Sequence, residues 1–394
     1  MERKLSSPMT PTFIVSAPRK VIVFGKHAAV YNKPAIAAAI SLRSYLLVTT
    51  LSKSQRTVKL NFRDIGLNHT WKIDTLPWNI FHQTAQKRFH YSLVNFLDPE
   101  LLDAIIPHAE AVSKDLPEKQ RKIHVRSATA FLYLFLSLGS PESPGFIYTL
   151  RSTIPTGSGL GSSASVCVCL SAALLLQIRN LTGPHPNQLP EEAEVQIERI
   201  NRSAFVGKLC IHGDPSGVDN VVSAGGKAVV FQRNNSGPPS VTPLTTFPKL
   251  PLLLVDTQQP RSTATEVEKV RTLKQRIREL VDYADIGWTK LTGAGGGGCA
   301  ITLFRPDVKD ETMEELERKF TAEGFQKYQT VLGADGVGVL WPAVFRNGTD
   351  AEGGEEIDQE KFENAVGVQG IEQLVGVEVQ ENRKGWKFWT RAVV

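Results

Sequence analysis

The sequence contains 394 residues, of which 41% are hydrophobic and 22% charged, a composition typical of a globular protein with room for two domains. Its formal net charge of +5 is small and its basic residues are dispersed, which argues against a nucleic-acid or membrane partner and suits a small anionic substrate. The cysteines have no metal-ligand spacing and no apolar signal segment is visible, so we expect reduced thiols and a cytoplasmic location. These cysteines are Cys167, Cys169, Cys210 and Cys299.

The first part of the chain alternates strand-like and helix-like patterns. A β-type run over residues 13–27 is interrupted at Pro18, and small residues over 27–40 predict a helix before a second strand over 44–51. Residues 85–140 predict helices, the last of which, over 128–138, is too short to cross a bilayer and is expected to be buried.

The second part of the chain contains the clearest boundary signal. The linker NNSGPPS at 234–240 has strong turn chemistry and divides the chain into predicted domains 1–235 and 236–394. Strands and helices are expected on both sides of it. The strands are predicted over 146–154, 250–257 and 300–304, and the helices over 164–178, 191–209 and 267–281.

A glycine-rich loop gives the strongest functional signal. The segment PTGSGLGSSA, residues 155–164, lies between a predicted strand and a predicted helix. Glycines allow the backbone to approach a ligand, and successive amide groups beside a helix N-terminus bind anions. The hydroxyl groups of Ser162 and Ser163 can bind a phosphate oxygen and a magnesium ion. This combination favours a phosphate-binding loop over an incidental turn with a serine N-cap.

Two familiar nucleotide motifs do not fit. A Walker loop requires a lysine after its last glycine, and no lysine follows Gly161. The glycine cluster at 293–298 matches the dinucleotide spacing but precedes a strand-like segment where that fingerprint requires a helix.

Three segments resemble the motifs of the GHMP kinase family in the right order. These are SAPRKVIVFGKHAAVYNKPA at 16–35, PTGSGLGSSAS at 155–165 and KLTGAGGGGCAITLF at 290–304. The segments IHGDPSGVDNVVS and QQPRSTATEV, and the ending GWKFW, resemble the members that phosphorylate mevalonate, the fungal ones in particular. The resemblance implies an α+β, two-domain GHMP kinase fold. Its N-terminal domain would be like domain 2 of ribosomal protein S5, its C-terminal domain ferredoxin-like, and ATP would bind between them.

The resemblance also implies roles for individual residues. Asp219 matches the family's catalytic base and Lys20 its partner in orienting and stabilising the reacting groups. The mevalonate-binding site would be lined by His27, Arg261 and Thr263, and Ser163 would ligate Mg²⁺. ATP would be held by Ser152, Gly157, Ser158, Gly159, Leu160, Gly161, Ser162 and Ser163. No role is expected for His212, which is interpreted as a packed loop residue.

The sequence also departs from the family pattern. Lys208 stands where the family has a magnesium-binding glutamate, which replaces attraction for the metal by repulsion. Arg19 stands at a family glycine and would be strained if that position required a positive φ, and Lys26 stands at a family glutamate. Asp214 is a candidate replacement for the missing carboxylate. The chain is also shorter than the family between 270 and 290.

The expected function is ATP-dependent phosphorylation of mevalonate to 5-phosphomevalonate in isoprenoid and sterol biosynthesis, by a protein that could form a homodimer. The alternative is a catalytically impaired homologue that binds nucleotide as a regulatory or interaction protein. A kinase of another small alcohol, such as phosphomevalonate or a sugar, is a third reading that the segments PSGVDN and QQPRST disfavour.

Overall fold

The computed structural model describes most of the chain. The described residues are 10–25, 28–81, 96–153, 162–185, 187–234, 239–256, 287–291, 299–305, 307–322, 324–345 and 355–391. The helix predicted over 267–281 and the glycine cluster at 293–298 lie outside them.

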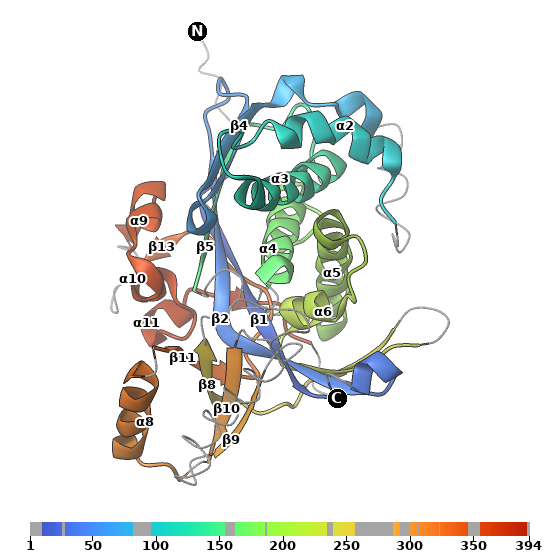
Figure 1. Cartoon of the computed structure of the whole chain (residues 1–394). Coiled ribbons are helices and arrows are strands. Elements are labelled where there is room, and N and C mark those ends of the chain that lie inside the picture. The colour runs from blue at the N-terminus through green and yellow to red at the C-terminus, as the bar shows by residue number, and fades with distance from the viewer. Residues whose placement is uncertain are drawn as a thin grey trace.

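Two long antiparallel strands, β1 (Phe13–Phe24) and β2 (Ala35–Thr50), lie at the centre of a 13-stranded sheet (Figure 1). Side chains alternate across β1, as expected for a strand. Phe13, Val15 and Ala17 face the larger core, under the helices α2 to α6. Ile14 faces a second core on the opposite side of the sheet, beneath α9 and α10. The sheet is therefore covered on both faces.

The helix predicted over residues 27–40 is wrong. Residues Ala28–Tyr31 form a single 3₁₀ turn, η1, and β2 begins at Ala35. The alanines of β2 pair with β1 on one side and with β6 (Ala228–Gln232) on the other, and their small side chains let α6 approach closely. Strand pairing and close packing here outweigh the helix propensity of alanine. Likewise Pro18 does not end β1, because a register shift between Pro18 and Arg19 accommodates it.

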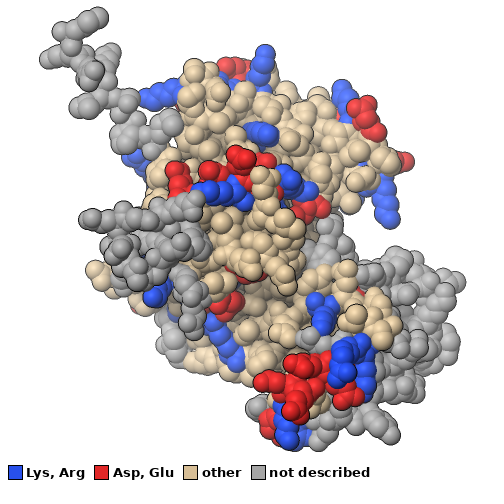
Figure 2. All heavy atoms as spheres, turned by 90° about the vertical axis from the view of Figure 1, so that its left-hand side faces the viewer, with Lys and Arg blue, Asp and Glu red and all other residues tan. Residues whose placement is uncertain are grey.

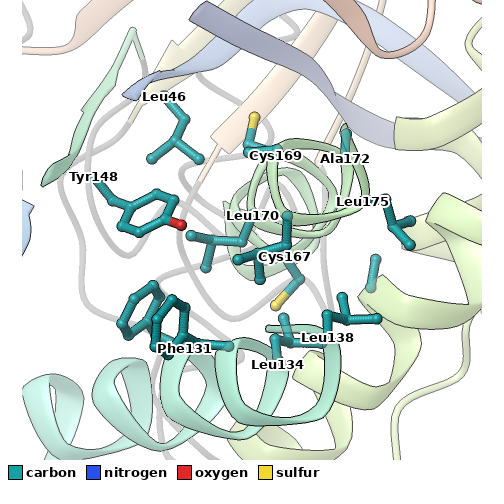
Figure 3. Close-up of a cluster of buried hydrophobic side chains, with 14 of the residues drawn as sticks. Leu46, Phe131, Leu134, Leu138, Tyr148, Cys167, Cys169, Leu170, Ala172 and Leu175 are labelled. Carbon is teal, nitrogen blue, oxygen red and sulfur yellow. The ribbon is translucent and has the colours of Figure 1, made fainter. Parts of the chain in front are cut away.

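The larger core confirms the two apolar helices predicted from the sequence. α3 (Glu118–Leu138) and α4 (Ser162–Gln177) each bury twelve side chains. Figure 3 shows Phe131 and Leu134 of α3 facing Cys167 and Leu170 of α4. Tyr148 and Leu46 close this cluster from the sheet. The four cysteines are free, and no described helix is long and apolar enough to cross a membrane.

The other elements of the N-terminal part surround this core. The strands are β3 (Thr57–Phe62), β4 (Leu67–Lys72), β5 (Phe146–Ser152) and β7 (Ser240–Leu244), and the helices are η2 (Arg63–Ile65), η3 (Ile73–Thr75), α2 (Pro99–Glu110), α5 (Pro190–His212) and α6 (Val218–Gly225).

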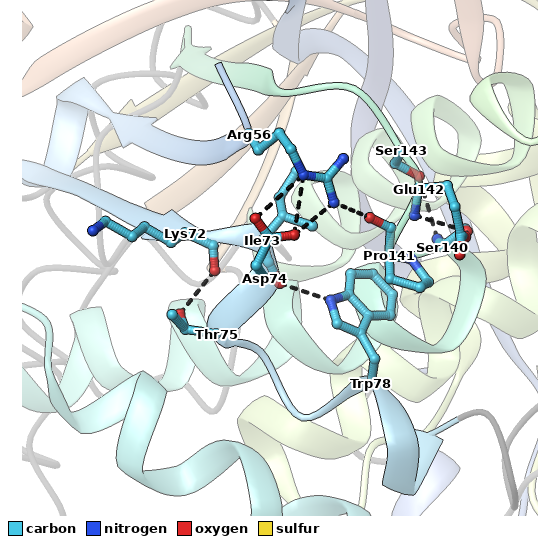
Figure 4. A network of polar contacts seen from close by, with 10 residues as sticks. All are labelled: Arg56, Lys72, Ile73, Asp74, Thr75, Trp78, Ser140, Pro141, Glu142 and Ser143. Atoms are coloured by element: carbon cyan, nitrogen blue, oxygen red, sulfur yellow. Dashed lines mark hydrogen bonds and ion pairs between the residues drawn. The ribbon is translucent and has the colours of Figure 1, made fainter. Parts of the chain in front are cut away.

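A polar network attaches the residues that connect α3 with β5 to η3, the 3₁₀ helix that follows β4. The Arg56 guanidinium pairs with both carboxylate oxygens of Asp74 and donates to the carbonyl of Pro141 (Figure 4). Trp78 donates its indole N–H to the carbonyl of Ile73 at 2.7 Å. The connection is thereby held against η3.

The C-terminal part contains four antiparallel strands in the order β11-β8-β10-β9, which is that of a ferredoxin-like sheet. They are β8 (Leu250–Asp256), β9 (Gly287–Leu291), β10 (Cys299–Phe304) and β11 (Gln326–Leu332), with α8 (Asp310–Ala322) packed against them. The expected α+β fold is confirmed. The domain boundary and the shortening between 270 and 290 stay predictions, because residues 235–238 and 257–286 lie outside the described ranges.

The end of the chain returns to the N-terminal strands. β12 (Gly338–Leu340) pairs with β1, and β15 (Lys387–Phe388) pairs with β12. Between them lie β13 (Val344–Phe345), β14 (Glu355–Glu356), α9 (Gln359–Asn364), α10 (Gly367–Val375) and α11 (Gln380–Arg383). On the face seen in Figure 2, lysines and arginines are interspersed with acidic residues, as the dispersed charge of the sequence predicts.

Candidate active site

Asp219 lies in the first turn of α6, where two features fix its position. Gly217 precedes the helix with φ 76°, a left-handed conformation that favours glycine. One turn after Asp219, the Ser223 hydroxyl donates to the carbonyl of Pro18 at 2.6 Å. Because residues i and i+4 share a helix face, this bond turns Asp219 toward β1.

Asp219 stands between two lysines from different elements. Its Oδ1 is 3.4 Å from Nζ of Lys20 on β1, and its Oδ2 is 3.2 Å from Nζ of Lys208 on α5. The three side chains are largely buried, with exposed fractions of 12% for Lys20, 19% for Asp219 and 6% for Lys208. The proximity of Lys20 and Asp219 was expected from the sequence, whereas the contact with Lys208 was not.

The two lysines determine the ionisation of Asp219. Burial alone would raise the pKa of the carboxyl, but the charges of Lys20 and then Lys208 outweigh it and lower the pKa below its ordinary value. Asp219 is therefore an anion at neutral pH, able to accept a hydrogen bond or a proton from a hydroxyl group.

The N-terminus of α4 meets the C-terminal end of α5 beside this cluster. α4 begins at Ser162, two residues before the start of the helix predicted over 164–178, and the Ser163 hydroxyl is 2.9 Å from Nε2 of His212. Burial, followed by the charge of Lys208, lowers the pKa of His212, so its imidazole is neutral at pH 7. Sequence reasoning missed His212. The one signal was its spacing: it lies one helical turn after Lys208 on the same face of α5.

A cavity of about 270 Å³ opens beside the start of α4. Its polar wall includes Ser152, Ser162, Ser163 and His212. The apolar wall comes from β3, η2, α3, β5 and α4. Its residues are Phe62, Ile65, Ile123, Ala130, Leu150, Val166 and Leu170. The cavity thus joins an apolar chamber to hydroxyl groups and the positive end of a 16-residue helix, a combination that suits an anionic ligand with a flat apolar part.

Arg19 forms part of the same wall. It lies within β1 and has no positive φ, so the strain anticipated at this position does not arise. Its Nη2 donates a hydrogen bond to Oγ of Ser152 at 2.8 Å. The carboxylate of Asp64 accepts a hydrogen bond from the backbone N–H of Ser152 at 2.6 Å. Burial lowers the pKa of Arg19 to about 9, which leaves the guanidinium protonated at neutral pH. Ser152 is thus held between a cation and an anion.

Several residues expected at the site lie outside the described ranges. They are Lys26, His27, Arg261, Thr263 and the loop residues Gly157, Ser158, Gly159, Leu160 and Gly161. β5 ends at Ser152 and α4 begins at Ser162, so the strand and the helix that flank the loop are where the sequence places them.

The described residues do not fit a divalent metal held by the protein. No group of three His, Cys, Asp or Glu side chains among them could hold an ion. Asp214 is exposed and makes no hydrogen bond or ion pair with another described residue. The Ser163 hydroxyl is bonded to His212, and an ammonium group stands where a carboxylate ligand would be needed.

Comparison with family models gives two matches. Residues 124–227 match the GHMP kinases N-terminal domain, and residues 257–322 match the GHMP kinases C-terminal domain. The first match contains α4, α5 and α6, which carry Ser163, Lys208 and Asp219.

Known proteins similar to the whole chain are mevalonate kinases. The chain is 65% identical to mevalonate kinase erg12 of Aspergillus fumigatus, over 100% of this chain and 85% of the relative. It is 55% identical to mevalonate kinase ERG12 of Gibberella zeae, over 99% of this chain and 90% of the relative. Both alignments span 455 positions although the chain has 394 residues, so these relatives contain residues with no counterpart here.

Solved structures show the same fold at low sequence identity. A crystal structure of mevalonate kinase superposes with a TM-score of 0.55 at 18% identity, covering 82% of this chain and 99% of the other. A putative sugar kinase from Campylobacter jejuni superposes with a TM-score of 0.52 at 14% identity, covering 84% of this chain and 99% of the other.

Proposed function

Because the chain belongs to the mevalonate kinase family of GHMP kinases, we propose that it transfers the γ-phosphate of ATP to the hydroxyl group of mevalonate, giving 5-phosphomevalonate. The observation that carries this proposal is the Lys20–Asp219 pair, 3.4 Å apart. Asp219 also contacts Lys208, one helical turn before His212, and His212 contacts Ser163 at the start of α4, so this arrangement connects the pair to that helix end. It combines an ionised carboxylate with a cation and a phosphate-binding helix end, the groups that phosphoryl transfer to an alcohol requires.

In the proposed reaction the alcohol oxygen attacks the γ-phosphorus, and the bond from that phosphorus to the leaving oxygen of ADP breaks. Asp219 accepts a hydrogen bond from the attacking hydroxyl and takes its proton as the new P–O bond forms. Lys20 keeps Asp219 ionised and stabilises the negative charge that develops on the transferred group. Positioning and charge compensation supply most of the catalysis, because there is little covalent chemistry for the protein to perform.

The nucleotide is assigned to the cavity beside α4. The apolar chamber suits a base, and Ser152 lies on its wall. The phosphates would lie at Ser162 and Ser163 and along the loop of Gly157, Ser158, Gly159, Leu160 and Gly161, where backbone amides and the helix dipole favour anions. Mevalonate would be bound by His27, Arg261 and Thr263. An arginine is well suited to a carboxylate because it can form two parallel hydrogen bonds.

We also propose, as the motif resemblance implies, a place in isoprenoid and sterol biosynthesis, a cytoplasmic location and a homodimer. Kinases of this family use ATP. Magnesium was expected as well, but since the described donor set does not fit a protein-held divalent ion, no step is assigned to it. Neither the described contacts nor the comparisons favour the alternative of a catalytically impaired homologue.

The test is ADP release in the presence of ATP and mevalonate, measured for the wild type and for Asp219→Asn. The amide keeps the size of the side chain but cannot take a proton, so we expect kcat to fall by about 10²–10⁴-fold while ATP still binds. Asp335→Asn is a matched control, because Asp335 also lies between two basic side chains, Lys227 and Arg383, as part of a separate network. It should keep near-normal kcat. Near-normal turnover of Asp219→Asn would remove Asp219 from the mechanism, and a wild type without mevalonate-dependent ADP release would contradict the proposed function.

A further inference from the structure

The cluster of Lys20, Asp219 and Lys208 contains one carboxylate and two ammonium groups. Each carboxylate oxygen faces one of the lysines, at 3.4 Å and 3.2 Å. One negative charge cannot offset two positive charges, so the cluster retains an excess of one positive charge. Because Lys208 is only 6% exposed, water screens this charge poorly.

Neighbouring groups do not supply the missing negative charge. The side chain of His212 does not supply it, because an imidazole is either neutral or positively charged. Asp214 is exposed and pairs with no described residue. The positive end of α4 begins at Ser162, next to the Ser163–His212 contact. The described part of the site is therefore electropositive and lacks a carboxylate that is free to bind a cation.

A site of this kind attracts a polyphosphate and repels a divalent cation. Magnesium prefers oxygen ligands and usually one or two carboxylates, but both oxygens of Asp219 already face ammonium groups. A lysine ammonium, by contrast, is a common phosphate ligand that acts as a point charge. Lys208 lies one helical turn before His212 on the same face of α5, and His212 contacts Ser163 at the start of α4, where the proposed function puts the ATP phosphates.

We propose that Lys208, together with Lys20, neutralises the terminal phosphates of the nucleotide in place of a protein-held divalent ion, so that the site takes metal-free ATP. The inference rests on the proposed function, because it assumes that ATP binds beside α4. The two can be tested separately, because only this inference predicts how the affinity for the nucleotide depends on magnesium.

The experiment measures ATP binding to the full chain by calorimetry, in buffer with EDTA and in buffer with magnesium. For the wild type we expect the two dissociation constants to agree within about threefold. Lys208→Met removes the charge at similar volume, and should weaken binding in EDTA by at least about tenfold. Lys208→Glu supplies a carboxylate, and should bind ATP only when magnesium is present. Thermal unfolding of each variant verifies that it is folded.

Lys309→Glu is the matched control. It makes the same change of charge at an exposed residue before α8, so both of its dissociation constants should equal those of the wild type. Wild-type binding that is more than about tenfold weaker in EDTA than in magnesium would overturn the inference and leave the proposed function standing. Unchanged binding by Lys208→Met in EDTA would overturn it as well. Absence of ATP binding in both buffers would overturn the proposed function and this inference together.

Discussion

The surroundings of two carboxyl groups in this molecule shift their pKa values in opposite directions. Asp219 is partly buried but paired with two lysines, so its pKa falls. Glu372 on α10 is also partly buried, and among the described residues its carboxylate accepts a hydrogen bond only from the hydroxyl of Tyr45, at 3.1 Å. Burial raises the pKa of Glu372 to about 7. The difference follows from charge pairing, since a hydroxyl compensates for lost hydration much less than an ammonium group.

The raised pKa of Glu372 predicts a pH-dependent stability. Its pKa is about 7 in the folded chain against an ordinary 4.5, so its contribution is fully present below about pH 4.5 and is lost as pH rises through 7. Glu372→Gln should therefore increase the free energy of unfolding at about pH 8, by roughly 1–3 kcal/mol, and give no increase at about pH 4.5. Denaturant unfolding at both pH values measures this, with the exposed Glu360→Gln on α9 as control. An equal effect of Glu372→Gln at both pH values would contradict the explanation.

Sequence reasoning selected candidate residues for the site but could not give their contacts. Lys20, Asp219 and Ser163 could be selected because each stands in a short motif with a chemical rationale. The pairing of Lys208 with Asp219 and of His212 with Ser163 could not, because each joins separate helices whose relative placement depends on packing. Lys208 was recognised as a departure from the family, but only the structure shows which carboxylate it contacts.

At the scale of elements, one side chain ties the C-terminal strands to the strand that carries Lys20. Lys290 on β9 donates from Nζ to the carbonyl of Val23 at 2.8 Å and to that of Ile22 at 3.3 Å. Lys290 is half-buried, and burial lowers its pKa. These bonds hold the end of β1 just beyond Lys20, so they connect the ferredoxin-like sheet with the proposed catalytic strand.

Lys290→Met should therefore affect both stability and catalysis. Loss of bonds from a charged donor costs about 1–3 kcal/mol, so we expect the Tm to fall by a few degrees. We also expect kcat to fall more than the KM for ATP rises, because the orientation of Lys20 would be less well fixed. Lys290→Arg keeps the donors and should restore part of kcat. Lys319→Met is the control, since Lys319 pairs with Glu315 on the exposed side of α8. A Lys290→Met protein with normal kcat would limit Lys290 to a structural role.

Element types were predictable where the pattern was long and apolar, and less so where small residues prevailed. α3 and α4 followed from their continuous apolar runs. The segment AIAAAI at 35–40 suggested a helix, because alanine favours helices locally. Its strand conformation is imposed by pairing with β1 and β6 and by the approach of α6, which are distant in sequence. Local propensity does not contain that information.

At the scale of the whole molecule, the last residues of the chain support the first domain. Trp389 is 1% exposed within the larger core, and its indole N–H donates to Oε1 of Gln196 on α5 at 2.8 Å. The same helix carries Lys208 and His212. The C-terminal end therefore stabilises a helix of the proposed active site.

Trp389→Ala should destabilise the entire molecule. Truncation of a buried tryptophan costs about 3–5 kcal/mol through lost burial and a residual cavity, and the Gln196 amide oxygen loses its donor. Trp288→Ala makes the same substitution at a side chain that is 66% exposed, and should change stability by less than about 0.5 kcal/mol. Denaturant unfolding of both variants makes the comparison, and similar losses for the two would show that Trp389 contributes little to the core.

The pairing of β1 with β12, and of β12 with β15, has a consequence for synthesis on the ribosome. Leu340, the partner of Ile14 across the sheet, lies more than 300 residues further along the chain and is therefore synthesised long after it. At a synthesis rate of about 5–20 residues per second, β12 is made tens of seconds after β1, and one edge of β1 has no partner strand during that time. During that time an apolar strand presents unpaired backbone groups, which other nascent chains can pair with. The nascent protein therefore exposes this edge until β12 is made, and a stop codon upstream of β12 would yield a chain whose β1 edge stays open.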